Sequence, residues 1–210
     1  MFDWPADGNL YLPGLKTDIQ KARLLSQTGS QEIRFEKLHG WVKFELPLRA
    51  PEKLASVVEV TLGKAAQADP TWGLDPNLET TVLVEFATVD GAVCDSVRWM
   101  EKFGEWKHAQ RVHQWEPGGK ATWEVDVLVP GVYDVGLTYS GEGRLVWSVA
   151  IENGERIQNQ QNSSHNYQQF PIGWVNFPKS GRYQVSASCV EGDLETASLE
   201  SIHFKRVEME

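Results

Sequence analysis

The sequence predicts an all-β protein made of two antiparallel β-sandwich domains of jelly-roll type. Short runs of β-branched and aromatic residues recur at intervals of roughly 8–12 residues, and glycine and proline turns separate them. The chain also holds nine tryptophans in 210 residues, and such large rings commonly fill the space between two packed sheets. Trp123 and Trp147 lie in alternating runs, so we expect both of them in a core.

The first domain is expected to span residues 1–63. Its clearest strand is the run 40–46, which alternates strictly. This alternation places Val42, Phe44 and Leu46 on one face and a tryptophan with two charged residues on the other. Further strands of this domain are expected at 9–12, 19–25, 33–38 and 54–62.

A linker is expected at residues 64–79, because this stretch has two prolines, small residues and no hydrophobic periodicity. Strands resume after it, so the second domain is expected to span 80–210. Its run 131–139 alternates strictly, whereas the segment 96–106 is interpreted as including one helical turn. Further strands are expected at 82–86, 121–129, 145–151, 175–177, 183–189 and 199–207.

Two glycine-containing turns organise the middle of the second domain. Asn153-Gly154 is the strongest two-residue hairpin signal in the chain. Gly141 and Gly143 are interpreted as a second hairpin turn, since they lack the third glycine and the strand-turn-helix setting that a dinucleotide site needs.

The charge balance excludes some partners. The chain has 20 Lys and Arg against 29 Asp and Glu, a formal charge of −9. Nucleic-acid and anionic-membrane binding depend on concentrated positive charge, so neither partner is expected. No apolar run approaches the roughly 18 residues of a membrane span, and the first five residues lack the pattern that opens a signal peptide.

No catalytic residue, metal ligand or cofactor is expected. The chain lacks the G-x-S-x-G and HExxH patterns, and its only cysteines, Cys94 and Cys189, form no CxxC; they are either free thiols or one disulfide. Paired carboxylates of a glycosidase lie roughly 5–9.5 Å apart, and sequence proximity alone does not set such a separation. The acidic residues considered for a catalytic pair are Glu101, Glu105, Glu116 and Glu124. Those considered as Ca²⁺ ligands are Asp69, Asp75 and Glu85.

Sugar binding requires exposed aromatic rings with amide or charged groups beside them. Trp174 is expected to point outward, because Val175 and Phe177 suit the inward face of the same strand. The amide-rich stretch 158–169 offers hydrogen-bonding groups, although it also fits a long polar loop without a ligand. The candidate sugar-binding residues are Trp106, Trp115, Trp174, Tyr167, Asn166 and His165.

The first part of the chain resembles the C-terminal region of bacterial α-L-fucosidases of glycoside hydrolase family 29. The resemblance rests on FDWPADG and LYLPGL within residues 2–15, and it continues at 21–25, 46–47 and 50–58. In that family, this order is similar to the β-sandwich that follows the catalytic barrel. The second half resembles an additional carbohydrate-binding-like module through residues 99–108, 121–123 and 131–133.

The resemblance implies a non-catalytic accessory portion of such an enzyme. The family's catalytic residues belong to a (β/α)₈ barrel of about 250 residues, so no position here inherits their roles. The implied functions are support of the barrel and binding of fucosylated glycan, in the periplasm or outside the cell. The match begins inside the first sandwich, so we expect an open edge or an uncovered apolar face there, available for self-association. The alternative is a purely structural or oligomerisation module without a ligand.

Overall fold

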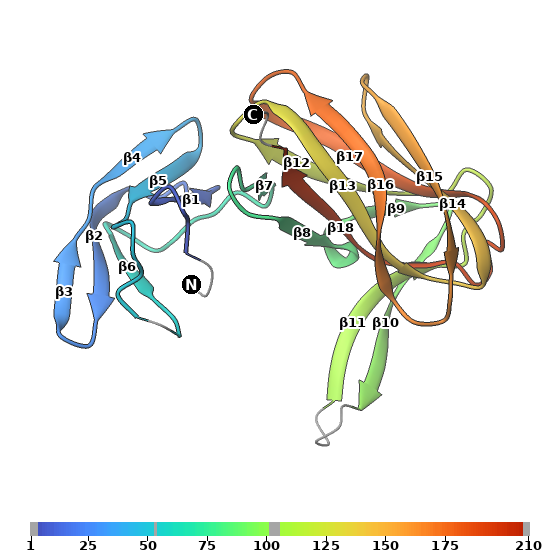
Figure 1. Cartoon of the computed structure of the whole chain (residues 1–210), viewed down its shortest axis with the longest axis horizontal. Coiled ribbons are helices and arrows are strands. Elements are labelled where there is room, and N and C mark those ends of the chain that lie inside the picture. The colour runs from blue at the N-terminus through green and yellow to red at the C-terminus, as the bar shows by residue number, and fades with distance from the viewer. Residues whose placement is uncertain (1–3, 53, 101–105, 208–210) are drawn as a thin grey trace. The chain divides into compact units, whose positions relative to one another are not determined.

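The computed structural model describes residues 4–52, 54–100 and 106–207, and the side chains of these ranges except for 97–100 and 106–108. The chain divides into two compact units, Met1–Gly73 and Leu74–Glu210. The predicted all-β antiparallel class is confirmed, and the described strands are labelled in Figure 1. The break between the units lies within the stretch 64–79 that was expected to be a linker.

The described part of unit 1 forms two small sheets around one core. The first has the order β1-β5-β4, with β1 at Asn9–Pro13, β5 at Trp41–Glu45 and β4 at Phe35–Leu38. The second has the order β3-β2-β6, with β3 at Gly29–Glu32, β2 at Ile19–Ser26 and β6 at Val57–Leu62. Their shared core contains the inward face predicted for β5, and its buried residues are Ala22, Leu24, Ile33, Val42, Phe44 and Leu46.

The segment before the break packs on unit 1. Trp41, on the other face of β5, is also buried, and a side chain at Gly73 would come within 2.3 Å of its ring. Asp69 donates its backbone N–H to the Gly14 carbonyl at 2.7 Å, and the Thr17 hydroxyl donates to the Ala65 carbonyl at 3.0 Å. These contacts join residues far apart in sequence, so the hydrophobic periodicity of the sequence does not predict them.

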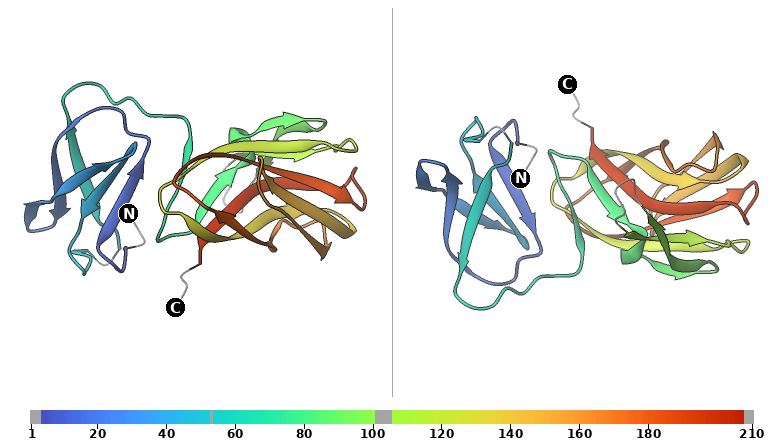
Figure 2. Two further views of the ribbon diagram at one scale, coloured as in Figure 1. Left: turned by 90° about the horizontal axis from the view of Figure 1, so that it is seen from above. Right: turned by 90° about the horizontal axis from the view of Figure 1, so that it is seen from below.

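Unit 2 is a sandwich of two larger sheets, seen as two layers in Figure 2. The first has the order β10-β11-β18-β13-β16, with β8 also paired to β18, and the second has the order β15-β14-β17-β12-β7, with β9 also paired to β12. The bounds in the first sheet are β8 Thr80–Leu83, β10 Val93–Met100, β11 Trp106–His113, β13 Gly131–Ser140, β16 Gln168–Phe177 and β18 Ser198–Arg206. Those in the second are β7 Trp72–Leu74, β9 Thr88–Asp90, β12 Lys120–Val127, β14 Gly143–Ile151, β15 Arg156–Ser163 and β17 Gly181–Glu191. A single short 3₁₀ turn, η1 at Val84–Phe86, is described.

Aromatic rings fill the space between these two sheets. Trp123 and Trp147 are buried as predicted, and the Trp123 indole donates to the Leu83 carbonyl at 3.0 Å. Tyr139 packs against Trp147 with ring centroids 5.0 Å apart. Because β13 and β14 supply these two rings from opposite sheets, the contact fastens one layer to the other.

Two hairpin turns and one helical turn were expected in unit 2. The hairpin at Asn153-Gly154 is confirmed, because β14 and β15 pair on either side of it. The turn at Gly141 joins β13 to β14 in the other sheet, so the hairpin predicted there is wrong. The helical turn expected at 96–106 is also wrong up to Met100, where the chain is strand β10, and residues 101–105 lie outside the described part.

Cys94 is exposed on β10 and Cys189 is buried on β17, and both are free. Burial raises the pKa of the Cys189 thiol to about 12. Among the described residues, no helix has the length and hydropathy to cross a membrane.

Candidate functional site

Trp174 projects from the outer face of the first sheet of unit 2. It is 68% exposed, whereas its neighbour Val175 and the next inward residue, Phe177, are buried. This is the outward orientation that the sequence predicts. Across the strand pair, Trp174 lies opposite Asp134 of β13, and Asp134 in turn lies opposite Lys205 of β18. One row of cross-strand neighbours thus carries an exposed indole, a carboxylate and an ammonium group on the same face.

A small hollow lies on the same face, and we call it the Gly136 hollow. Its volume is about 270 Å³, close to the lower end of ligand pockets, which start at roughly 300 Å³. Gly136 of β13 contributes no side chain there, and a Cβ atom at this position would lie 3.4 Å from Nε2 of Gln169. The lining residues are Glu79, Asp134, Val135, Gly136, Gln169, Pro171, His203 and Lys205.

A β-bulge shapes the floor of this hollow. The pairing of β13 with β16 shifts between Val135 and Gly136, which leaves Ile172 as an extra residue on β16. Ile172 is buried, and Gly173 beside it has φ +148°, a conformation that glycine adopts readily. The extra residue returns Pro171 to the outer face, so the alternation of β16 resumes on both sides of the bulge.

His203 forms the polar wall of the hollow and is only 8% exposed. Its Nδ1 lies 3.3 Å from Oε1 of Glu79 and 3.0 Å from the Thr81 hydroxyl. Its Nε2 lies 2.7 Å from the Thr138 hydroxyl and 3.1 Å from that of Ser201. An ionised carboxylate only accepts, so this arrangement fits a neutral ring with hydrogen on Nδ1 and a hydroxyl donating to Nε2. Burial lowers the pKa of His203, and the nearby Glu79 charge opposes this effect.

The hollow combines hydrogen-bond donors and acceptors of several kinds. Gln169 donates from Nε2 to Oε1 of Glu79 at 3.2 Å, and this bond links β16 to the segment before β8. Asp134 and Glu79 offer carboxylate oxygens, whereas Lys205 offers an ammonium group. Together with the indole of Trp174, these groups can bind a small ligand that has one apolar face and several hydroxyls.

Three of the predicted sugar-binding residues lie at the other end of β16. Tyr167 precedes β16 and lies seven residues before Trp174, which corresponds to roughly 23 Å of extended chain at about 3.3 Å per residue. The Tyr167 hydroxyl lies 2.6 Å from that of Ser198, and His165 forms an ion pair with Glu142 across 3.1 Å. Asn166, between them, is exposed. The structure therefore does not bring these three residues to the Gly136 hollow.

Among the described side chains, neither of the two other predicted tryptophans, Trp115 and Trp106, supplies an exposed ring. Trp115 is only 5% exposed, and it meets Trp147 edge-on with ring centroids 5.3 Å apart. The expectation of an exposed sugar-binding ring at Trp115 is therefore wrong, because this ring belongs to the core although the residue lies in a loop. Trp106 begins β11 opposite Met100, and its side chain lies outside the described part of the chain.

The polar residues of the hollow were missed by the sequence interpretation. The alternation of β18 could have placed His203 on the outer face, because Ile202 and Phe204 are both inward. No spacing rule brings Glu79 to His203, since they meet only through the pairing of β8 with β18. Among the described residues, no group of three or more His, Cys, Asp or Glu could hold a metal ion.

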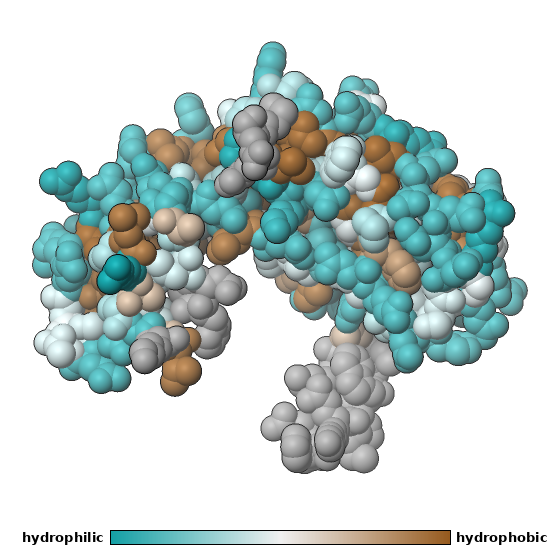
Figure 3. Space-filling view, in the orientation of Figure 1, coloured by the Kyte–Doolittle hydropathy of each residue, from teal (hydrophilic) through white to brown (hydrophobic). Residues whose placement is uncertain are grey.

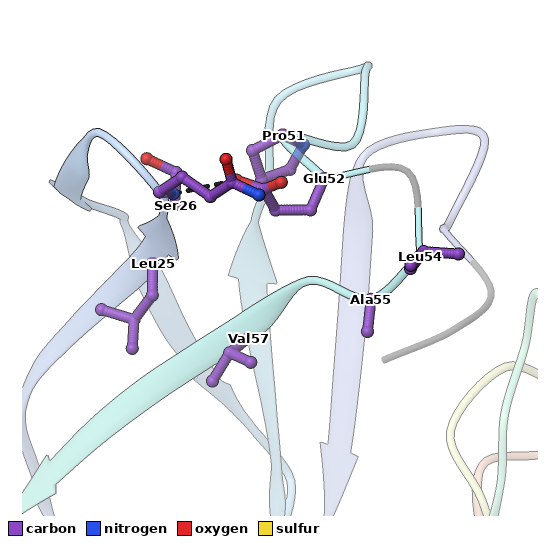
Figure 4. Close-up of a pocket in the computed structure, with 8 residues that line it drawn as sticks. Leu25, Ser26, Pro51, Glu52, Leu54, Ala55 and Val57 are labelled. Atoms are coloured by element: carbon purple, nitrogen blue, oxygen red, sulfur yellow. Dashed lines mark hydrogen bonds between the residues drawn. The ribbon is translucent and has the colours of Figure 1, made fainter.

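A second, shallow groove lies on unit 1 (Figure 4). It is lined by β2, β6 and the loop before β6, with a volume of about 800 Å³. Leu54 in that loop is 88% exposed, and Val57 of β6 is also exposed. Glu52 accepts the backbone N–H of Gln27 at 2.9 Å, which fastens the loop to the end of β2. Five of its eight lining residues are apolar, and the others are Ser26, Gln27 and Glu52. The face of the molecule in Figure 3 is largely hydrophilic.

Comparison with known proteins finds similarity at the level of structure. No family model and no curated protein sequence matches the chain. An α-L-fucosidase from Vibrio sp. strain EJY3 aligns with 98% of this chain and 37% of its own, at 12% identity and TM-score 0.56. A GH26-CBM35 β-(1,4)-mannanase from Podospora anserina aligns with 63% of this chain and 28% of its own, at 16% identity and TM-score 0.50.

The mosquito-larvicidal Cry4Aa toxin from Bacillus thuringiensis is also similar. It aligns with 91% of this chain and 30% of its own, at 12% identity and TM-score 0.52. The chain thus spans between about a quarter and two fifths of the length of these three proteins. At such low identity, the similarity establishes a shared β-sandwich fold.

Proposed function

We propose that this chain is a non-catalytic carbohydrate-binding portion of a glycoside hydrolase, with its sugar site on the outer face of β16, β13, β18 and β8. The observation that carries the proposal is the 68% exposed ring of Trp174 beside the Gly136 hollow. The exposed indole supplies an apolar face next to a polar hollow, which is the combination that a sugar ring with its hydroxyl groups can use. The fold shared with the Podospora mannanase, whose name includes a CBM35 module, supports the same proposal.

The binding mode follows from the chemistry of this face. The C–H face of a sugar ring packs on the indole of Trp174, which supplies a large apolar surface at low entropic cost. Hydroxyl groups then donate to Asp134 and Glu79 and accept from Lys205 and Gln169. The hollow has room for about one sugar residue, so the site recognises a single ring, such as the terminal residue of a glycan.

The test is a glycan-array screen of the whole chain, followed by calorimetry on the glycans that bind. Trp174→Ala should weaken binding at least roughly tenfold, whereas the free energy of unfolding should change by less than about 0.5 kcal/mol because the ring is exposed. The matched control is Tyr167→Ala, which removes an exposed ring at the other end of β16. Unchanged affinity in Trp174→Ala, or loss only in Tyr167→Ala, would contradict the proposed site.

The second part of the proposal concerns the parent enzyme, for which we favour an α-L-fucosidase that acts in the periplasm or outside the cell. The FDWPADG and LYLPGL runs support it, as does the alignment of both units with the Vibrio α-L-fucosidase. In this proposal, unit 1 supports the catalytic barrel and unit 2 binds fucosylated glycan.

A hydrolysis assay checks that the chain has no activity of its own. Glu79 and Asp134 both line the Gly136 hollow, so the site does contain two carboxylates. We expect no release of nitrophenol from aryl fucosides or aryl glucosides by the purified chain. Turnover that disappears in Asp134→Asn or Glu79→Gln would identify a catalytic pair and overturn the non-catalytic proposal.

An association role for unit 1 is the second candidate, and the exposed apolar residues of its groove favour it. Three exposed apolar residues lie on or beside the loop before β6, namely Leu48, Leu54 and Val57. Strand β6 is itself an edge strand of its sheet. Self-association through this surface predicts a concentration-dependent increase in mass by analytical ultracentrifugation. Leu54→Glu should abolish that increase, and a monomer at all concentrations would exclude the role.

A further inference from the structure

We infer that the Gly136 hollow selects sugars by charge: it accepts neutral rings and disfavours uronic acids, and Asp134 and Glu79 set this selectivity. The inference rests on the proposed function and names the class of sugar that the site takes. It depends on where the charges of the hollow lie relative to Trp174.

The charge count of the hollow is negative. Two carboxylates, Asp134 and Glu79, line it together with one ammonium group, Lys205. His203 contributes little positive charge at neutral pH, because its ring is buried and burial lowers its pKa despite the nearby Glu79 charge. A uronate therefore adds a second unbalanced negative charge to the site, on a chain whose formal charge is already −9.

The order of the groups across the sheet decides which charge a ligand meets first. Asp134 lies between Trp174 on one neighbouring strand and Lys205 on the other. A ring stacked on Trp174 therefore lies next to the carboxylate, and the ammonium group is one strand farther away. Because strands are roughly 4.8 Å apart, the backbone of Asp134 lies nearer to Trp174 than that of Lys205, so we expect a substituent of the stacked ring to meet Asp134 first.

The same carboxylates that repel a uronate also bind neutral sugars. A carboxylate accepts charge-assisted hydrogen bonds from hydroxyl groups, which are stronger than bonds between neutral partners. The second carboxylate, Glu79, is held in place by the bond from Gln169 and by its contact with His203. Attraction for one class of ligand and repulsion of another thus come from the same two residues.

The experiment titrates the whole chain at pH 7 and low salt with methyl glycosides of glucose, galactose and mannose and with the three corresponding methyl uronates. Binding is followed by the NMR signal of the Trp174 indole. We expect each neutral glycoside that binds to do so at least roughly fivefold more tightly than its uronate, with a smaller ratio in 0.5 M NaCl.

Variants then test which residues set the ratio. Asp134→Asn and, separately, Glu79→Gln should each reduce the neutral-to-uronate ratio at least roughly threefold. The matched control is Glu124→Gln, which removes the same charge from β12 in the other sheet and should leave the ratio unchanged. Use of two separate variants keeps the test decisive if one of them fails to fold.

The outcomes separate the two proposals. If uronates bind as tightly as the neutral glycosides, or if Glu124→Gln changes the ratio as much as Asp134→Asn, the charge selectivity is wrong and the carbohydrate-binding function stands. If none of the six glycosides shifts the Trp174 signal and the glycan array is also blank, the function and this inference fall together.

Discussion

At the scale of single residues, the sequence predicted the orientation of Trp174 but not that of Trp115. The alternation of β16 determines which way Trp174 points, and alternation is a local property of the chain. Trp115 follows the end of β11 among polar residues, and its burial results from contact with Trp147, a residue distant in sequence. No local pattern carries that information, so a charged neighbourhood was misinterpreted as exposure.

The buried histidine of the hollow gives the chain a pH-dependent stability. Because the pKa of His203 is lowered in the folded chain, the unfolded chain takes up a proton first as the pH falls below about 6.5. Above pH 6.5, the titration of His203 leaves the free energy of unfolding unchanged. Below pH 6.5, it lowers that free energy by at most about 1.4 kcal/mol per pH unit. Urea unfolding midpoints at pH 7.5, 6.5 and 5.5 measure the slope.

Two variants isolate this effect from that of the other histidines. His203→Gln should flatten the slope between pH 6.5 and 5.5, whereas His165→Gln, which changes an exposed histidine, should keep it. Stability that rises as the pH falls through this range would mean that the Glu79 charge outweighs burial, and the direction assigned to the His203 pKa would then be wrong.

At the scale of elements, the positions of strands were more predictable than their partners. The run 131–139 was expected from its alternation, and it is strand β13 almost in full. The turn at Gly141 has the composition of a hairpin, yet the chain there crosses from one sheet to the other. The difference depends on which strands pair, and β13 pairs with β16 and β18, both distant in sequence. The hollow has the same origin, since its walls come from β13, β16, β18 and the residue before β8.

Gly136 of β13 provides the test at the scale of elements. Gly136→Leu should fill the hollow with an outward side chain and weaken glycan binding at least roughly tenfold, by removing the space for the sugar ring. The free energy of unfolding should change by less than about 1 kcal/mol, because the new side chain leaves the core unchanged. Calorimetry with a glycan that binds the unmodified chain, together with thermal unfolding, measures both effects. Retained affinity would show that the sugar lies elsewhere.

At the scale of the whole molecule, the chain consists of two units, each with its own core. Two domains were expected from the sequence, and the structure divides the chain after Gly73. The stretch expected as a linker is hydrogen-bonded to unit 1 up to Asp69, because backbone groups at Gly14 and Lys16 accept or donate to it. The break after Gly73 falls within this stretch, and composition gave no information about these contacts.

Separate cores predict separate folding. A chain of residues 74–210 should fold on its own, unfold in one cooperative transition and bind glycans within about threefold of the affinity of the whole chain. Circular dichroism and calorimetry on the shortened and whole chains provide the comparison. Loss of cooperative unfolding or of binding in the shortened chain would show that unit 2 depends on unit 1.

The most direct test of carbohydrate binding at Trp174 is an NMR titration of the nine tryptophan indole groups of the whole ¹⁵N-labelled chain with glycans selected by the array. The variant Trp174→Phe assigns the Trp174 signal. We expect this signal to shift most, with those of the buried Trp115, Trp123 and Trp147 nearly unchanged. A saturable shift confined to other tryptophans, with Trp174 unaffected, would contradict the proposed site.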